Sequence, residues 1–177
     1  MTEVEKGVQT VLVTEEEIRQ RLCELGKEVS AVYQGQDLLL VTLLKGAVVF
    51  LADFMRALEC HCEIDFLVTS SFGGGAMKII KDLEVPIEGR HVLIVEDILD
   101  SGIKLSKIKD MLEARNPASV RIVTLLDKPS RRKADVNADF TGFVIPDEFV
   151  VGYGLDYDEK YRNLPFVGVL KPEVYTG

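Results

Sequence analysis

The sequence predicts an α/β protein with a mainly parallel central sheet flanked by helices. Strand-like apolar runs alternate with helix-like amphipathic segments along the chain, which is the pattern of a parallel sheet with crossover helices. Two of these runs, at 37–44 and 91–98, contain unbroken apolar stretches, LLLV and VLIV, as expected for strands covered on both faces. A chain of 177 residues is long enough to enclose one such core.

Three segments have the apolar spacing of amphipathic helices. In the first, 15–33, apolar residues recur every three or four positions, and Thr14 with Glu17 forms a capping-box pattern at its start. Segments 47–59 and 103–116 follow the first and third long strands and are predicted to be the other helices.

The remaining apolar runs are predicted to be strands. They lie at 37–44, 63–71, 77–81, 91–98 and 119–127, with short β segments near 142–145, 149–153 and 166–169. We therefore expect a single domain over 1–177. Residues 36–130 would form the core sheet, and residues 1–35 and 131–177 would add a helix and a small loop-rich hood.

Composition narrows the classes of partner. The net charge is −8, which argues against nucleic acid as a partner. No apolar run reaches the roughly 18 residues of a membrane span, and the acidic start MTEVEKGVQT does not resemble a targeting segment. Three cysteines, Cys23, Cys60 and Cys62, fit a reducing cytoplasm. The stretch ECHCE around His61 is too small a cluster for a zinc site, so it is interpreted as a helix–strand junction.

The most informative stretch is VLIVEDILDSGIKL at 92–105. Glu96 and Asp97 end a buried strand, and Asp100 precedes a Ser-Gly turn into a helix. Backbone N–H groups in such a turn, with the positive end of the helix, suit a phosphate. The acids suit a vicinal diol or Mg²⁺, although solvated loop acids are an alternative. A sugar phosphate would satisfy both halves of the motif.

This stretch resembles the phosphoribosyl-pyrophosphate signature of the type I phosphoribosyltransferases. LLKGA, IDFLVTSS, LLDKPSRR and the stretch 145–175 are similar to the bacterial hypoxanthine-guanine members of that family. The resemblance implies the family's fold, with transfer of the 5-phosphoribosyl group from phosphoribosyl pyrophosphate to hypoxanthine or guanine. It also implies Mg²⁺ as cofactor and a homodimer or homotetramer.

The resemblance assigns roles around the signature. Glu96 and Asp97 would hold the ribose hydroxyls, and Asp100 would be the general base near the purine N7. The 5′-phosphate would be bound by Asp100, Ser101, Gly102, Ile103 and Lys104. Lys104 departs from the family, which usually has Thr there, and an exposed lysine pointing to solvent is the alternative.

Pyrophosphate would be bound by Lys45, Gly46 and Arg162, with Lys45 often reached in this family through a strained Leu-Lys peptide. Guanidinium suits bidentate phosphate contacts. The metal would be carried by Glu96, Asp97 and Asp156, together with substrate phosphates.

The purine would contact Lys128, Phe149, Val150 and Asp156. Lysine has donors and no acceptor, so Lys128 can bond a 6-oxo group but faces the donor amino group of adenine. The neighbouring Arg131, Arg132 and Lys133 are interpreted as a solvated basic turn.

A Gly-rich stretch after the second long strand departs most from the family. Ser70, Ser71, Phe72 and Gly73 match the start of a mobile loop that is shortened here, and a shorter lid would slow transfer or admit water. Two alternatives to the salvage enzyme stay open: a regulator of the same fold that senses the ribosyl donor without catalysis, and a transferase that prefers xanthine. The retained Asp100 and the acidic composition favour the enzyme.

Overall fold

The computed structural model describes residues 2–71 and 77–176. Its centre is a six-stranded sheet in the order β4-β3-β2-β5-β6-β7. All neighbouring pairs are parallel except β3 and β4, which are antiparallel. The strands are β2 (Leu38–Leu43), β3 (Glu63–Ser71), β4 (Met77–Lys81), β5 (His91–Leu99), β6 (Ser119–Asp127) and β7 (Phe140–Val144). The prediction of a mainly parallel sheet is confirmed.

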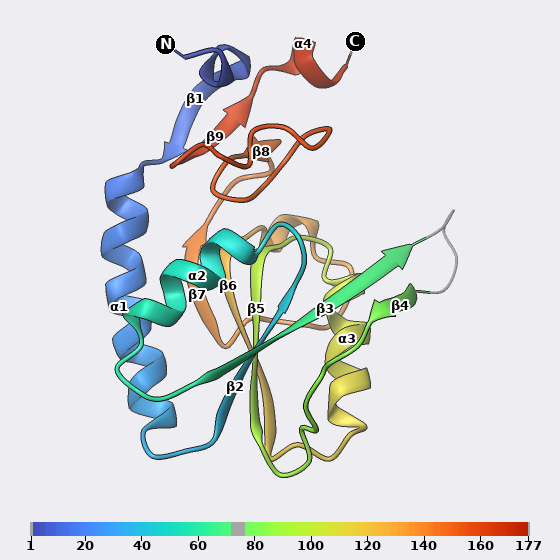
Figure 1. Cartoon of the computed structure of the whole chain (residues 1–177). Helices are drawn as coiled ribbons and strands as arrows, with labels where there is room; N and C mark the ends of the chain where they lie inside the picture. The colour runs from blue at the N-terminus through green and yellow to red at the C-terminus, as the bar shows by residue number, and fades with distance from the viewer. Residues whose placement is uncertain (1, 72–76, 177) are drawn as a thin grey trace.

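Helices cover both faces of this sheet, because successive residues of each buried strand point to opposite sides. On β2, Leu38 and Leu40 pack toward α1 (Glu15–Tyr33) and α2 (Val48–Ala57). Leu39 and Val41 pack instead toward α3 (Ile103–Glu113) and the segment around Ile87. Figure 1 shows α1 and α3 on opposite sides of the sheet. Burial on both faces explains why these strands read as continuous apolar runs.

The capping box predicted for the first helix is present. The Thr14 hydroxyl accepts a hydrogen bond from the Glu17 N–H, and the Glu17 carboxylate accepts one from the Thr14 N–H. The helix begins at Glu15 and ends at Tyr33, as predicted. The other two helices end earlier than predicted, at Ala57 and Glu113.

A second, three-stranded antiparallel sheet forms the hood above the carboxyl ends of the core strands (Figure 1). Its order is β1 (Val8–Val13), β9 (Val167–Leu170), β8 (Val150–Val151), so the first and last strands of the chain are paired. Two 3-10 turns and one short helix complete the structure: η1 (Val4–Gly7), η2 (Pro129–Arg131) and α4 (Pro172–Tyr175). A small apolar cluster centred on Val151, Leu164 and Leu170 holds the hood together.

Two features differ from the sequence-based expectation. The first strand, β1, was not predicted. Its middle residues are exposed and Val13 is buried, so it lacks the pattern that marks a buried strand. The other is β7, which lies within 131–177 yet pairs with β6 in the core sheet rather than belonging to the hood. Among the residues described, none of the helices combines the length and apolar character needed to cross a bilayer.

Candidate active site

The acid pair lies within the C-terminal part of the central strand, as the predicted strand at 91–98 implied. Glu96 and Asp97 belong to β5 and are each 8% exposed. Asp97 Oδ1 accepts a hydrogen bond of 2.7 Å from the Ile98 N–H, whereas Glu96 Oε2 is buried with no partner. Burial of a carboxylate without a partner is unfavourable, so this oxygen is available to a donor group or cation that the chain itself does not supply.

Burial and mutual repulsion change how these two acids ionise. Desolvation raises the pKa of Glu96 well above its usual value, and the adjacent Asp97 carboxylate raises it further. Desolvation also raises the pKa of Asp97, while a hydrogen bond shared with Glu96 opposes this rise. Lys104 lowers the pKa of both acids through its charge. Lys104 itself is exposed, and it lines the same cavity as the acid pair.

The turn after β5 forms a small cradle. Gly102 is the N-cap of α3 with φ +74°, and a Cβ there would lie 2.5 Å from Val136 Cγ1, so only glycine fits. The first N–H groups of a helix have no partners within the helix, and Gly102, Lys104 and Leu105 at the start of α3 line a cavity of about 170 Å³. This cavity is lined by Glu96, Asp97, Ile98, Leu99, Asp100, Gly102, Lys104 and Leu105. The predicted phosphate turn and the acid pair therefore share one cavity.

In the basic turn at 131–133, the half-buried Arg132 holds this cradle, whereas Arg131 and Lys133 are exposed, as the sequence suggested. The Arg132 guanidinium donates to the carbonyls of Leu99 and Asp100 and to the Asp127 carboxylate. The Ser101 carbonyl accepts from two backbone N–H groups, those of Lys133 and Ala134, at 2.9 and 3.1 Å. The carbonyls of the turn are thus held by 132–134.

The end of β2 packs directly against the acid pair. A Cβ at Gly46 would lie 1.9 Å from Asp97 Oδ2, so any larger residue there would displace the carboxylate. The peptide between Leu44 and Lys45 is cis. Lys45 itself projects outward, and its Nζ lies 3.0 Å from Glu159 Oε2. Gly46 and Asp97 meet because β2 and β5 are neighbours in the sheet.

Arg162 approaches Lys45 from the hood side. Its Nη2 lies 2.8 Å from Asp156 Oδ1 and 3.5 Å from Glu159 Oε1. Its Nη1 donates to the Gly154 carbonyl at 2.8 Å. The two cations predicted to bind pyrophosphate thus contact a common carboxylate, that of Glu159, and Asp156 is paired with Arg162.

The predicted purine contacts lie at the end of β6 and the start of β8. Lys128 is 6% exposed, and its Nζ donates to the Glu148 carbonyl. Burial lowers the pKa of Lys128, while the charges of Asp147 and Asp100 partly oppose this decrease. The Lys128 ammonium is therefore fixed in a poorly hydrated position.

Phe149 differs from the other apolar residues of its segment. Val150 is buried in β8, but Phe149 is 39% exposed. The ring of Tyr175 stacks on it at 4.8 Å and 18°, and Tyr157 meets it edge-on at 5.7 Å. Sequence reasoning missed Tyr175, since only the folded hood brings α4 next to β8.

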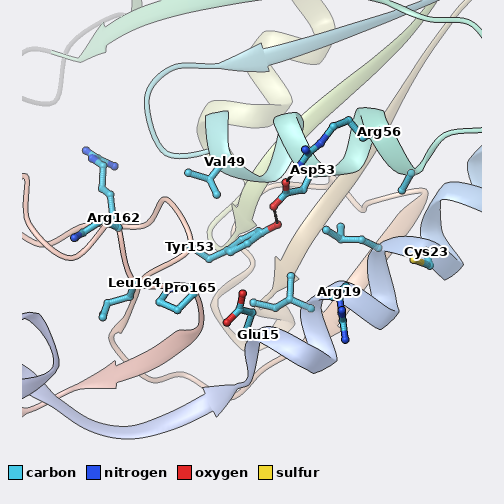
Figure 2. A pocket seen from close by; sticks show the side chains of 14 residues that line it. Glu15, Arg19, Cys23, Val49, Asp53, Arg56, Tyr153, Arg162, Leu164 and Pro165 are labelled. Atoms are coloured by element: carbon cyan, nitrogen blue, oxygen red, sulfur yellow. Dashed lines mark hydrogen bonds and ion pairs between the residues drawn. The ribbon is translucent and has the colours of Figure 1, made fainter. Parts of the chain in front are cut away.

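A larger cavity of about 610 Å³ lies elsewhere, between α1, α2 and the hood. Figure 2 shows Tyr153 and Asp53 at its centre, where the Tyr153 hydroxyl donates to Asp53 Oδ2 at 2.5 Å. Burial and this neighbouring carboxylate raise the pKa of Tyr153. Neither the acid pair nor the phosphate turn lines this cavity. Its lining mixes apolar side chains with charged ones such as Asp53 and Arg56, and it includes Arg162 of the predicted pyrophosphate contacts.

The described part of the chain holds no metal cage made of protein side chains alone. Within 2–71 and 77–176, no group of three or more His, Cys, Asp or Glu side chains is arranged to hold a metal ion. The unpartnered oxygen of Glu96 beside Asp97 nevertheless fits a hard cation, provided that a substrate supplies most of the ligands.

Of the predicted mobile loop, only Ser70 and the backbone of Ser71 are described, and Phe72 and Gly73 lie outside the described residues.

Comparison with known proteins agrees with this arrangement. Residues 12–158 match the model of the phosphoribosyl transferase domain. The chain is 52% identical to the hypoxanthine-guanine phosphoribosyltransferase of Bacillus subtilis (strain 168) over 173 residues, which are 95% of this chain and 96% of that protein. The chain belongs to the hypoxanthine-guanine phosphoribosyltransferase family.

Other members of the phosphoribosyltransferase family differ in length. The chain is 50% identical over 174 residues to the bifunctional protein TilS/HprT of Listeria innocua, but it spans only 27% of that protein. Two solved phosphoribosyltransferase structures are similar over nearly their full length. The hypoxanthine phosphoribosyltransferase of Staphylococcus aureus gives a TM-score of 0.97 at 49% identity, covering 99% of this chain and 98% of that one. The hypoxanthine phosphoribosyltransferase of Trypanosoma cruzi in complex with the product IMP gives a TM-score of 0.93 at 40% identity. The match covers 96% of this chain and 98% of that one. The predicted phosphoribosyltransferase fold is therefore confirmed.

Proposed function

We propose that this chain transfers the 5-phosphoribosyl group of phosphoribosyl pyrophosphate to hypoxanthine and guanine, yielding IMP or GMP and pyrophosphate, a purine-salvage reaction. The observation that carries the proposal is the shared cavity. A buried acid pair with one unpartnered oxygen lines the same cavity as the first residues of α3. A ribose 5-phosphate has the diol and the phosphate that these two halves require.

In this proposal the chain works mainly by positioning and electrostatics. The N–H groups of Ser101 to Lys104 hold the 5′-phosphate, and Glu96 with Asp97 orients the ribose hydroxyls. As pyrophosphate leaves, the sugar carbon becomes cationic, and the nearby carboxylates stabilise that charge. Lys45, Gly46 and Arg162 hold the leaving pyrophosphate.

The purine lies between the hood and the core in this proposal. Lys128 donates to its 6-oxo group, while Phe149 and Val150 form the wall against the base. Asp100 accepts the proton from N7 as the new bond forms at N9. Mg²⁺ would be held by Glu96, Asp97 and Asp156 together with substrate oxygens, and it would neutralise charge on the pyrophosphate.

We further propose a homodimer or homotetramer in the cytoplasm, without nucleic-acid or membrane partners. Support for self-association comes from the outer face of α2. Val48, Ala52 and Met55 share one face at helical spacing and are all exposed, and Leu44 next to the helix is exposed as well. A second copy would cover these side chains.

The enzyme proposal is tested by supplying the whole chain with phosphoribosyl pyrophosphate, Mg²⁺ and each of hypoxanthine, guanine, xanthine and adenine. Nucleotide should form with hypoxanthine and guanine but not with adenine. Asp100→Asn should lower turnover about 10²- to 10⁴-fold, as loss of a general base does, while the donor still binds. Absence of product from every 6-oxopurine would overturn the proposal, and product from xanthine alone would replace it with a xanthine transferase.

A further inference from the structure

Glu159 lies between the two cations assigned to pyrophosphate. Its Oε2 is 3.0 Å from Lys45 Nζ, and its Oε1 is 3.5 Å from Arg162 Nη2. One carboxylate thus spans a lysine from the core and an arginine from the hood, residues more than one hundred positions apart in the sequence. Sequence reasoning assigned no role to Glu159.

The loop backbone aims Glu159 at this position. Glu159 has φ +60°, and its N–H donates to Asp156 Oδ2 at 3.0 Å. Asp156 in turn is paired with Arg162. A glutamate carboxylate is ionised at neutral pH, and here it is within ion-pair distance of both cations. An anionic side chain of the protein therefore occupies the position where a phosphate would meet the same two cations.

The contact is also easily exchanged. The side chains of Lys45 and Glu159 are 68% and 66% exposed, so water and ligands reach both groups. An ion pair this exposed is weak and gives way to a ligand with more charge. Pyrophosphate carries several anionic oxygens and can bind both cations at once.

We propose that Glu159 acts as an internal stand-in for pyrophosphate, holding Lys45 and Arg162 while the subsite is empty and competing with pyrophosphate for them. This inference rests on the proposed function, because it takes these two cations to be the pyrophosphate ligands. The competition lowers the fraction of chains whose cations are free and weakens pyrophosphate binding by the same factor. It therefore favours release of the product pyrophosphate.

The test compares Glu159→Gln with a matched control one residue away, Asp158→Asn. Asp158 also has a positive φ, is exposed, and lies 3.9 Å from Lys160 rather than near the two predicted cations. Binding of inorganic pyrophosphate would be measured by calorimetry on the full chain without Mg²⁺, at low and high salt. Glu159→Gln should bind about two- to fivefold more tightly than the original chain, as an exposed ion pair allows. The gain should shrink at high salt, and Asp158→Asn should bind like the original chain.

Glu159→Ala provides the second variant. A residue that only supports the loop would give weaker binding when truncated, whereas a competing anion gives tighter binding with both Gln and Ala. Unchanged or weaker pyrophosphate binding in both variants overturns the inference. If the original chain forms nucleotide normally in that case, the proposed function stands and only the role of Glu159 falls. If the original chain neither binds pyrophosphate nor forms nucleotide, the proposed function falls and this inference with it.

Discussion

At the scale of single residues, the main electrostatic cost lies in the acid pair. Glu96 is buried beside Asp97, has an oxygen without a partner, and has a raised pKa. A natural sequence retains such a residue where a bound ligand supplies the missing partner of its carboxylate. Without the ligand, the same residue lowers the stability of the protein.

This cost gives a pH-dependent prediction. Because the folded chain holds the Glu96 proton more tightly than the unfolded chain, the stability from Glu96 is fully present below the unfolded pKa, and it is lost as pH rises through the folded pKa. Glu96→Gln cannot ionise, so at pH 8 without ligands it should be more stable than the original chain by about 1–3 kcal/mol. This difference in the free energy of unfolding between the two proteins should become smaller toward pH 4.

Thermal unfolding of both proteins from pH 4 to 8 measures this gap. Glu88→Gln, at an exposed acid, is the control and should show no gap at any pH. A stability difference for Glu96→Gln that stays constant with pH would mean that ionisation of Glu96 is not its cause.

Lys128 carries a prediction about specificity. Its buried ammonium offers donors only, whereas the glutamine amide offers a donor and an acceptor. Lys128→Gln should lower kcat/KM for hypoxanthine about 10²-fold or more. It should also lower the ratio of kcat/KM for hypoxanthine to kcat/KM for adenine. Steady-state kinetics with both bases measures this. Lys133→Gln, an exposed lysine of the same loop, should leave both values unchanged, and an intact preference in Lys128→Gln would remove Lys128 from base selection.

At the scale of elements, features that depend on neighbouring residues could be predicted from the sequence. Features that depend on contacts between distant segments could not. The first helix was predicted with its correct ends because its capping box and apolar spacing are local. The acid pair was recognisable because it abuts an apolar strand. The first strand was missed because its partner, β9, follows more than 150 positions later. The clamp made by Arg132 depends on carbonyls of another loop, which no local pattern reveals.

The cap of α1 gives a prediction at this scale. Thr14→Ala removes the acceptor of the Glu17 N–H and should lower the free energy of unfolding by about 1 kcal/mol. Thr14→Ser keeps the hydroxyl and should lose much less. Urea unfolding of the three proteins measures the difference, and equal losses in the Ala and Ser variants would show that the hydroxyl is not what stabilises the helix start.

At the scale of the whole molecule, the core and the hood must keep a fixed position relative to each other, because each supplies part of the site. The core supplies the acid pair and the phosphate turn, and the hood supplies Arg162 and Phe149. The hydrogen bond from Tyr153 to Asp53 joins the hood to α2 (Figure 2). Association of a second copy on the outer face of α2 would brace this same helix.

Val48→Glu combined with Met55→Glu tests that association. Two new charges on the exposed face of α2 should separate the copies, because burying unpaired carboxylates is costly. Light scattering on eluting protein should report a dimer or tetramer for the original chain and a monomer for the double variant. Lys107→Glu, on the exposed side of α3, should keep the original mass. A monomeric original chain, or an unchanged mass in the double variant, would contradict self-association through α2.

The pairing of β1 with β9 has a consequence for how the protein is made. Synthesis runs from the N-terminus, and early segments fold as they emerge from the ribosome. The core strands β2 to β7 are complete by Val144, but β1 waits for β9, whose last residue is Leu170. The core sheet can therefore form during synthesis before β9 has been made, whereas the hood sheet can close only once β9 is available to pair with β1 and β8.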